Sequence, residues 1–265
     1  MKIIAEIGWN HLGNIYLAEK MIVAASKSGA DFCKFQTWSE SYLKKGPWDK
    51  DGRREIYKKA QLSYEDHIFL KKVCKKNKVE FLTTVFNIND VDWLSRINPD
   101  FIKIGSPEIY NVELIQKCLK KFKNVFLSTG ASKWNELQKL KKLKMKNKLV
   151  LFHNVSSYPC EVENINMPKI KYLKKISKRI GYSGHLNGVN DAIFAICKGA
   201  EYIEKHFTIN QNLCGRDNKF SILPKDLKII SNFRNDYLKM NKFKGLNLQN
   251  CEKDTFHLAR GRWSK

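Results

Sequence analysis

The chain repeats one pattern eight times: a short apolar run ending in polar residues, then a stretch with helical periodicity. The apolar runs cover residues 3–7, 32–37, 80–86, 101–106, 125–129, 149–155, 179–183 and 202–208. The clearest stretches with an apolar period of 3.6 residues cover 18–28, 64–76, 112–121, 134–144, 189–198 and 224–239. Such alternation predicts parallel strands joined by right-handed helical crossovers.

Eight units within about 240 residues predict a closed (β/α)8 TIM barrel rather than an open doubly wound sheet. An open sheet usually carries a glycine-rich first turn, and this sequence contains neither G-x-G-x-x-G nor a P-loop motif. We therefore predict a single-domain α/β barrel over residues 1–240, followed by a C-terminal tail over residues 241–265.

The composition excludes several classes of protein. Hydrophobic residues make up 43% of the 265 residues, which excludes disordered and fibrous chains. The net charge is +23, but the lysines gather in runs such as residues 139–144, which are typical of the solvated faces of helices. Because no aromatic residues alternate with these runs and no nucleic-acid-binding motif is present, we do not expect a nucleic-acid partner.

The sequence also indicates where the protein works. No run approaches the roughly 18 apolar residues of a membrane span, so we expect no membrane partner. Glu6 lies where a signal peptide would need its apolar core. The seven cysteines are scattered and form no C-x-x-C pair. These features predict a cytoplasmic protein with reduced thiols.

Polar side chains recur at the carboxyl ends of the predicted strands, where barrel enzymes place their active sites. Two of them, Lys34 and Lys103, are suited to binding phosphate or carboxylate. Hydroxyl groups at other strand ends would complete an anion site, namely Thr84, Ser106, Ser128, Ser156 and Ser183.

Two alternatives apply to these lysines. Either lysine could instead form a buried ion pair with Glu6 or Glu108. A lysine at this end of the barrel could also form a Schiff base, as in class I aldolases, and the candidates are Lys103 and Lys205.

Two histidines, His185 and His206, end the seventh and eighth predicted strands. Two imidazoles at a barrel mouth can hold a divalent transition metal, although each could instead be a structural histidine. Glu204 shares a strand face with His206 and is suited to activating a water molecule. Among the other histidines, only His11 is a candidate for the site. Asp217 follows the eighth strand and is either a sugar ligand or a turn residue.

Motifs in nearly every predicted strand resemble those of the N-acetylneuraminate (sialic acid) synthase family. They occur in the family's order over residues 1 to about 225. The motifs are IAEIG (4–8), KFQT (34–37), KIGSPE (103–108), LSTG (127–130), SYP (157–159), GYSGH (181–185) and EKHFT (204–208).

The resemblance implies condensation of phosphoenolpyruvate with the open-chain aldehyde of an acetamido sugar, giving a nonulosonic (sialic-acid-like) acid and phosphate. It implies Mn²⁺, with Mg²⁺ or Co²⁺ as alternatives, bound by His185 and His206. The implied catalytic residues are Glu204, Glu6 and Lys103. Phosphoenolpyruvate would be bound by Lys34, Thr84, Lys103, Ser106, Ser128, Ser156 and Ser183. The sugar would be bound by Glu6, Gln36, Glu108, Tyr158, Asp217 and Arg216.

The chain departs from the family pattern at several positions. Gly184 stands where the family usually has Asp, Ser156 where Asn is common, and Val85 where Pro is usual. The family's C-terminal antifreeze-like domain, which caps the partner's site, is not expected here. We therefore predict a homodimer or a separate capping polypeptide, or else a protein that works without the cap. In the latter case Arg216, which stands where Pro is usual, would substitute for the cap's arginine.

Two other functions remain open on the sequence alone. The first is another aldolase or a 3-deoxy-ulosonate synthase on the same barrel, because a two-histidine metal site beside an anion site fits these enzymes too. The second is a non-catalytic sugar-binding barrel, which the missing cap and Gly184 suggest.

Overall fold

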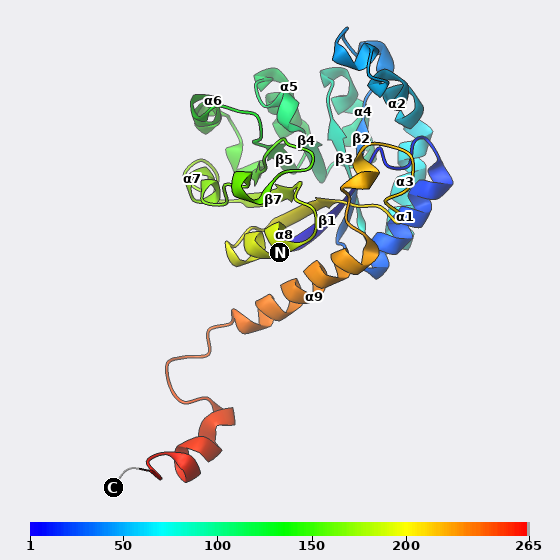
Figure 1. Ribbon diagram of the computed structural model, residues 1–265. Helices are drawn as coiled ribbons and strands as arrows, with labels where there is room; N and C mark the ends of the chain where they lie inside the picture. The colour runs from blue at the N-terminus through cyan, green and yellow to red at the C-terminus, as the bar shows by residue number, and fades with distance from the viewer. Residues whose placement is uncertain (264–265) are drawn as a thin grey trace.

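The computed structural model describes residues 1–263 and contains one closed barrel of parallel strands in chain order (Figure 1). Over these residues the eight strands are β1 (Lys2–Gly8), β2 (Phe32–Thr37), β3 (Glu80–Val85), β4 (Phe101–Ile104), β5 (Asn124–Ser128), β6 (Leu149–His153), β7 (Ile180–Gly184) and β8 (Tyr202–His206). β1 pairs with β8 and closes the ring. The predicted fold is confirmed. Five strands, β3, β4, β5, β6 and β8, end one or two residues earlier than predicted.

Helices cover the outside of the barrel. They are α1 (Ile15–Lys27), α2 (Arg53–Ala60), α3 (Tyr64–Lys76), α4 (Val91–Ile97), α5 (Val112–Lys121), α6 (Trp134–Lys139), α7 (Lys169–Leu173), α8 (Asn190–Cys197) and α9 (Pro224–Met240). Capping residues fix some starts: α3 follows Ser63, whose side chain accepts a hydrogen bond from the Asp66 amide. The stretch predicted as a helix over 134–144 is interrupted, because a 3-10 turn (Leu140–Lys142) follows α6.

Strand alternation divides the core into two regions. Outward-facing residues such as Ala5, Cys33 and Ile203 pack with the apolar faces of the helices. The inward-facing residues of the lower barrel form a separate cluster, which we call the apolar layer: Ile4, Phe32, Leu82, Phe126, Val150, Phe152 and Tyr202. Its rings pack closely, with 4.6 Å between the ring centroids of Phe126 and Tyr202. The apolar layer fills the barrel below the carboxyl ends of the strands.

The segment after α9 lies apart from the barrel (Figure 1). Residues 241–263 are almost entirely exposed, including Phe243, Leu246 and Trp263. The last two residues of the predicted tail lie outside the described range. Within that range, no helix has both the length and the apolar character needed to cross a membrane.

Candidate active site

A cavity of about 1310 Å³ opens at the carboxyl ends of the strands. Of the site residues that the family resemblance implies, all but Ser156 line it. These are Glu6, Lys34, Gln36, Thr84, Lys103, Ser106, Glu108, Ser128, Tyr158, Ser183, His185, Glu204, His206, Arg216 and Asp217. They come from every strand of the barrel or from the loop that follows it, so strand-end position alone brought them together.

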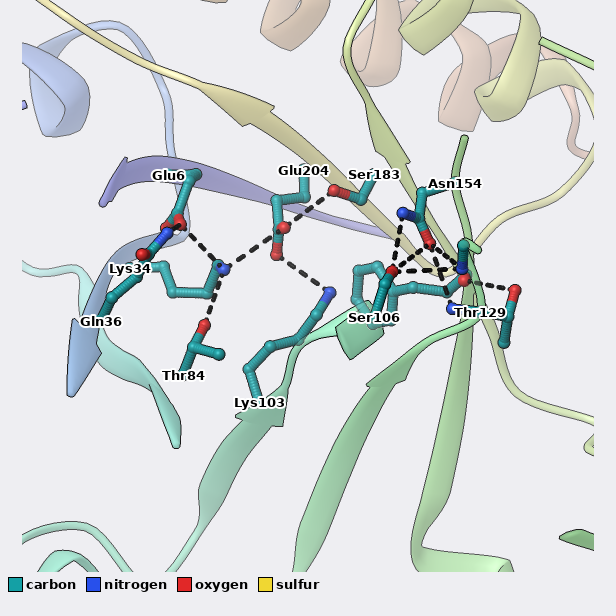
Figure 2. Close-up of polar contacts among 12 residues, drawn as sticks. Glu6, Lys34, Gln36, Thr84, Lys103, Ser106, Thr129, Asn154, Ser183 and Glu204 are labelled. Carbon is teal, nitrogen blue, oxygen red and sulfur yellow. Dashed lines mark hydrogen bonds and ion pairs between the residues drawn. The ribbon is translucent and has the colours of Figure 1, made fainter. Parts of the chain in front are cut away.

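Lys34 on β2 joins three other strands at the base of this cavity (Figure 2). Its Nζ lies 3.1 Å from Glu6 Oε1 on β1 and 3.4 Å from Glu204 Oε1 on β8, and it donates a 3.0 Å hydrogen bond to Thr84 Oγ1 on β3. Lys34 thus forms the buried ion pair with Glu6 that the sequence left open as an alternative, and it lines the cavity as well. Gln36 Nε2 donates a 2.6 Å hydrogen bond to the same oxygen of Glu6.

Lys103 on β4 lies opposite, and its Nζ is 3.2 Å from Glu204 Oε2. Its ammonium group also lies 3.4 Å from the ring centroid of Phe152, where the apolar layer ends. Ser183 Oγ donates a 2.9 Å hydrogen bond to Glu204 Oε1. Lys103 therefore pairs with Glu204 and not with Glu108. We call Glu6, Lys34, Thr84, Lys103, Ser183 and Glu204 the polar layer.

Burial and pairing move the pKa values of this layer in opposite directions. Burial alone would raise the pKa of Glu204, but the two lysines beside it lower this value to about 2. Burial raises the pKa of Glu6 to about 7 and lowers that of Lys103 to about 8. Glu6 Oε2 is buried without a hydrogen-bond partner. The layer therefore holds one carboxylate that stays ionised and two groups that can exchange protons near neutral pH.

Asn154 is a site residue that the sequence analysis missed. Its Oδ1 accepts hydrogen bonds from the backbone amides of Thr129 (3.1 Å) and Gly130 (2.8 Å). Its Nδ2 donates to Ser106 Oγ at 2.9 Å, so one side chain holds the ends of β4, β5 and β6 together (Figure 2).

Ser156, the residue predicted in this position, is exposed and does not line the cavity. Because β6 ends at His153 rather than at residue 155, Ser156 lies in the loop beyond the strand. Asn154 follows Phe152 at the two-residue spacing of inward-facing positions, and this spacing was the signal that could have identified it.

His185 and His206 lie at neighbouring strand ends with ring centroids 5.5 Å apart. His185 Nδ1 lies 2.6 Å from the Val155 carbonyl oxygen, so that nitrogen carries the proton and Nε2 keeps its lone pair. Burial lowers the pKa of His185 to about 4 and that of His206 well below its usual range, so both are neutral at pH 7.

These two imidazoles fit a metal site with open coordination positions. Neutral imidazoles are the ligand form, and a backbone carbonyl on the second nitrogen is the usual support of a ligating histidine. His206 Nδ1 is buried and lies 3.3 Å from Asp217 Oδ2, but at an angle that makes no hydrogen bond. Within residues 1–263, no cluster of three or more His, Cys, Asp or Glu side chains has metal-binding geometry, so the remaining ligands would be water or substrate.

The outer part of the cavity has an aromatic wall that the sequence analysis also missed. Trp38 packs edge to face with both Trp9 and Tyr57, which are tilted against each other; the ring centroids lie 5.1 to 6.1 Å apart, and all three line the cavity. Trp38 and Tyr57 belong to the long segment between β2 and α3, and Trp38 Nε1 donates to the Tyr57 carbonyl oxygen at 3.0 Å. Aromatic faces of this kind suit the apolar parts of a bound ligand.

Two candidates lie outside the cavity. Lys205 faces away from the barrel interior, where its buried ammonium group pairs with Asp191. It therefore cannot form a Schiff base with a substrate in the cavity. His11 is buried in the loop after β1, and its Nδ1 accepts a hydrogen bond from the Gly13 amide.

Known protein families and sequences resemble this chain over most of its length. The NeuB family model matches residues 21–244. N,N'-diacetyllegionaminic acid synthase of Campylobacter jejuni is 34% identical over 245 residues, which cover 86% of this chain and 73% of that protein. Pseudaminic acid synthase of the same species is 33% identical, covering 83% and 68%.

Among solved structures, N-acetylneuraminic acid synthetase from Leptospira borgpetersenii in complex with citrate superposes with a TM-score of 0.86 at 30% identity. The match covers 97% of this chain and 92% of the other. The family match spans most of the chain and includes the strands that carry the polar layer from Lys34 onward. This chain belongs to the NeuB family.

Proposed function

We propose that the protein condenses phosphoenolpyruvate with the aldehyde form of an acetamido sugar to give a nonulosonic acid and phosphate. The main support is the placement of two buried lysines and two neutral histidines in one cavity. The lysines suit a highly charged anion, and the histidines suit a Lewis acid beside it. The relatives named as legionaminic and pseudaminic acid synthases support the same class of product.

In this proposal, Lys34, Lys103 and the surrounding hydroxyl groups bind phosphoenolpyruvate. Its C3 attacks the aldehyde carbon, forming the new carbon–carbon bond and leaving a cation at C2. Water then adds to C2 while Glu204, held ionised by its two lysines, accepts the proton. The bond between C2 and the phosphate oxygen breaks last, releasing phosphate.

His185 and His206 would hold a divalent metal, Mn²⁺ in preference to Mg²⁺ or Co²⁺. When bound, the metal supplies charge stabilisation for the aldehyde oxygen. The sugar lies on the outer side of the cavity, with Glu6, Gln36, Glu108, Tyr158, Asp217 and Arg216 as its polar ligands. Glu6 has a pKa of about 7 and can give a proton to the oxygen that becomes a hydroxyl group.

We further propose that the enzyme works in the cytoplasm and that a second copy or another polypeptide covers the cavity mouth. All seven cysteines are free, in keeping with a reducing compartment. Light scattering with and without substrates tests the assembly: a monomer with full activity would contradict the covering partner.

Calorimetric titration of phosphoenolpyruvate into the Mn²⁺-loaded protein tests the anion site. We expect saturable binding in the wild type and in His185→Ala, and no binding in Lys103→Ala. Phosphate release is then measured with acetamido sugars and with phosphorylated aldoses. Release only with a phosphorylated aldose would favour a 3-deoxy-ulosonate synthase, and a folded wild type that binds no phosphoenolpyruvate would overturn the proposal.

Arg216 offers a test of the sugar side of the cavity. The residue lies in the loop after β8, lines the cavity, and stands beside Asp217. We expect Arg216→Ala to raise the sugar KM about tenfold, the loss of one charged hydrogen bond, and to leave the phosphoenolpyruvate KM unchanged. An unchanged sugar KM and kcat would remove Arg216 from the site.

A further inference from the structure

Gly184, the last residue of β7, has no backbone reason to be glycine. Its φ lies outside the left-handed region, where L side chains are strained. The restriction is one of space: a Cβ at this position would lie 2.1 Å from Oδ2 of Asp191. The place a side chain of residue 184 would occupy is therefore filled by a carboxylate from α8.

Asp191 lies in the first turn of α8 and is 2% exposed. Its carboxylate accepts two hydrogen bonds from Lys205 Nζ, at 3.1 Å on Oδ1 and 3.0 Å on Oδ2. Tyr182 Oη donates to Oδ2 at 3.1 Å, and the Ala192 amide donates to Oδ1 at 2.8 Å. Both carboxylate oxygens are thus fully used, deep between the barrel wall and α8.

Lys205 is the outward-facing residue between Glu204 and His206 on β8, and it is 3% exposed. Besides the two contacts with Asp191, its Nζ donates a 2.7 Å hydrogen bond to the carbonyl oxygen of Leu186. A buried ion pair is costly to desolvate and adds little net stability. A positioning role would explain why this one is kept, because Leu186 directly follows His185.

The backbone around His185 is held from two sides. Outside the barrel, Lys205 holds the Leu186 carbonyl. On the other side, His185 Nδ1 contacts the Val155 carbonyl, and the His185 carbonyl accepts a 2.9 Å hydrogen bond from the Cys160 amide. Only the first of these contacts depends on an ion pair.

We propose that Asp191 is a positioning residue for the metal centre. Acting through Lys205, it fixes the backbone of residues 184–186 and so sets the direction of the His185 imidazole. Gly184 is then the counterpart of Asp191, since it leaves room for the carboxylate that supports the site from α8. This inference rests on the proposed function and adds an outer supporting pair to its metal ligands.

The test measures binding of Mn²⁺ alone by calorimetry, with thermal unfolding recorded for every variant. Removing only Asp191 would leave Lys205 charged and buried, so the main variant is Asp191→Leu with Lys205→Met, which keeps the region apolar. We expect Mn²⁺ affinity to fall about tenfold or more, the usual effect of losing support behind a ligating histidine, with the fold retained.

A second variant moves the carboxylate instead of deleting it. Residue 184 pairs in register with Lys205, so Gly184→Asp combined with Asp191→Ala places a carboxylate beside the same ammonium group. We expect this variant to bind Mn²⁺ within about threefold of the wild type. The control is Arg179→Met with Glu201→Gln, an ion pair before the starts of the same two strands, at the opposite end of the barrel, which should leave Mn²⁺ affinity unchanged.

The outcomes separate this inference from the proposed function. A wild type that binds no Mn²⁺ overturns the metal centre itself, and this inference with it. A wild type that binds Mn²⁺ no better than the Asp191→Leu, Lys205→Met variant overturns only the positioning role. A relocated carboxylate that fails to restore binding in a folded protein also overturns it.

Discussion

The apolar layer and the polar layer are built by the same strands, only two residues apart. On β8, Tyr202 belongs to the first and Glu204 to the second, and on β2 Phe32 is followed by Lys34 in the same way. Strand alternation turns all four side chains inward, so facing the interior does not decide their chemistry. The position along the strand decides this chemistry. The residue nearer the start of the strand packs among aromatic rings, and the residue nearer its carboxyl end lines the cavity.

The two layers also differ in what their burial does for the protein. Ring packing in the apolar layer removes hydrocarbon from water and stabilises the fold, by about 25 cal/mol for each Å². The polar layer buries four charged groups whose desolvation is only offset by their mutual pairing. Substitutions in the apolar layer should therefore lower stability, and those in the polar layer should chiefly lower activity.

The largest expected effect is on activity, in Glu204→Gln. The amide keeps the shape but cannot accept a proton, so phosphate release should fall about 10³-fold. Glu201→Gln, just before the start of the same strand and partly exposed, is the control and should retain full activity. Circular dichroism confirms that both variants fold. Activity within tenfold of the wild type would refute the role given to Glu204.

The next effect is on stability, in Phe126→Ala. Phe126 contacts four other rings of the lower barrel, so its loss should lower the free energy of unfolding by about 3–5 kcal/mol. Urea unfolding measures this. Phe243→Ala, in the exposed segment, should change it by less than about 0.5 kcal/mol. A Phe126→Ala protein that stays stable but loses activity would contradict the assignment of stability to the apolar layer and activity to the polar layer.

Asn154→Ala should have an intermediate effect on substrate binding. It removes one of the two hydrogen-bond acceptors of the Thr129 amide and of the Gly130 amide, at a cost of about 0.5–1.5 kcal/mol for each lost bond, and it removes the contact with Ser106. We expect phosphoenolpyruvate affinity, measured by calorimetry, to fall about tenfold. Ser156→Ala is the matched control and should bind normally. A larger loss in Ser156→Ala would restore the assignment made from the sequence.

The last prediction has the smallest effect at neutral pH and concerns the outer face of β6. His153 faces outward between Phe152 and Asn154, and burial lowers its pKa to about 4. The folded protein therefore favours neutral His153, whereas the unfolded chain binds a proton at a higher pH. The contribution of His153 to stability is complete above pH 6.5 and is lost as the pH falls toward 4.

His153→Gln should remove this dependence. In that interval the wild type should lose stability faster than the variant, by up to about 1.4 kcal/mol per pH unit. Urea unfolding at several pH values gives both slopes. Equal slopes would show that His153 takes up no proton on unfolding.

The sequence predicted the barrel and many of the residues that line its cavity because both depend on local patterns. Alternation placed Lys34, Glu204 and His206 inward, and strand ends gathered them in one cavity. Three helices were not among the clearest periodic stretches, for local reasons as well. α2 is mostly charged and buries only Ala60, while α4 and α7 are too short to show periodicity.

What could not be predicted depends on contacts between distant segments. The carboxylate missing at Gly184 is supplied from α8, and no local pattern links Asp191 to that space. The aromatic wall joins Trp9 to Trp38 and Tyr57 across a long loop. The end of β6 was misjudged because just past this strand the Asn154 side chain, and not its backbone, accepts hydrogen bonds from the Thr129 and Gly130 amides.

The barrel can close only after the ribosome has synthesised β8, because β8 pairs with β1. β1 ends at Gly8 and β8 begins at Tyr202, so 193 residues must be translated between the two strands that pair. At 5–20 residues per second, the ribosome needs about 10–40 s for this stretch. During that time one edge of β1 has no neighbour and can pair with another nascent chain. Lys34 meets Glu204 only after this interval, so no partial chain on the ribosome can carry a complete site.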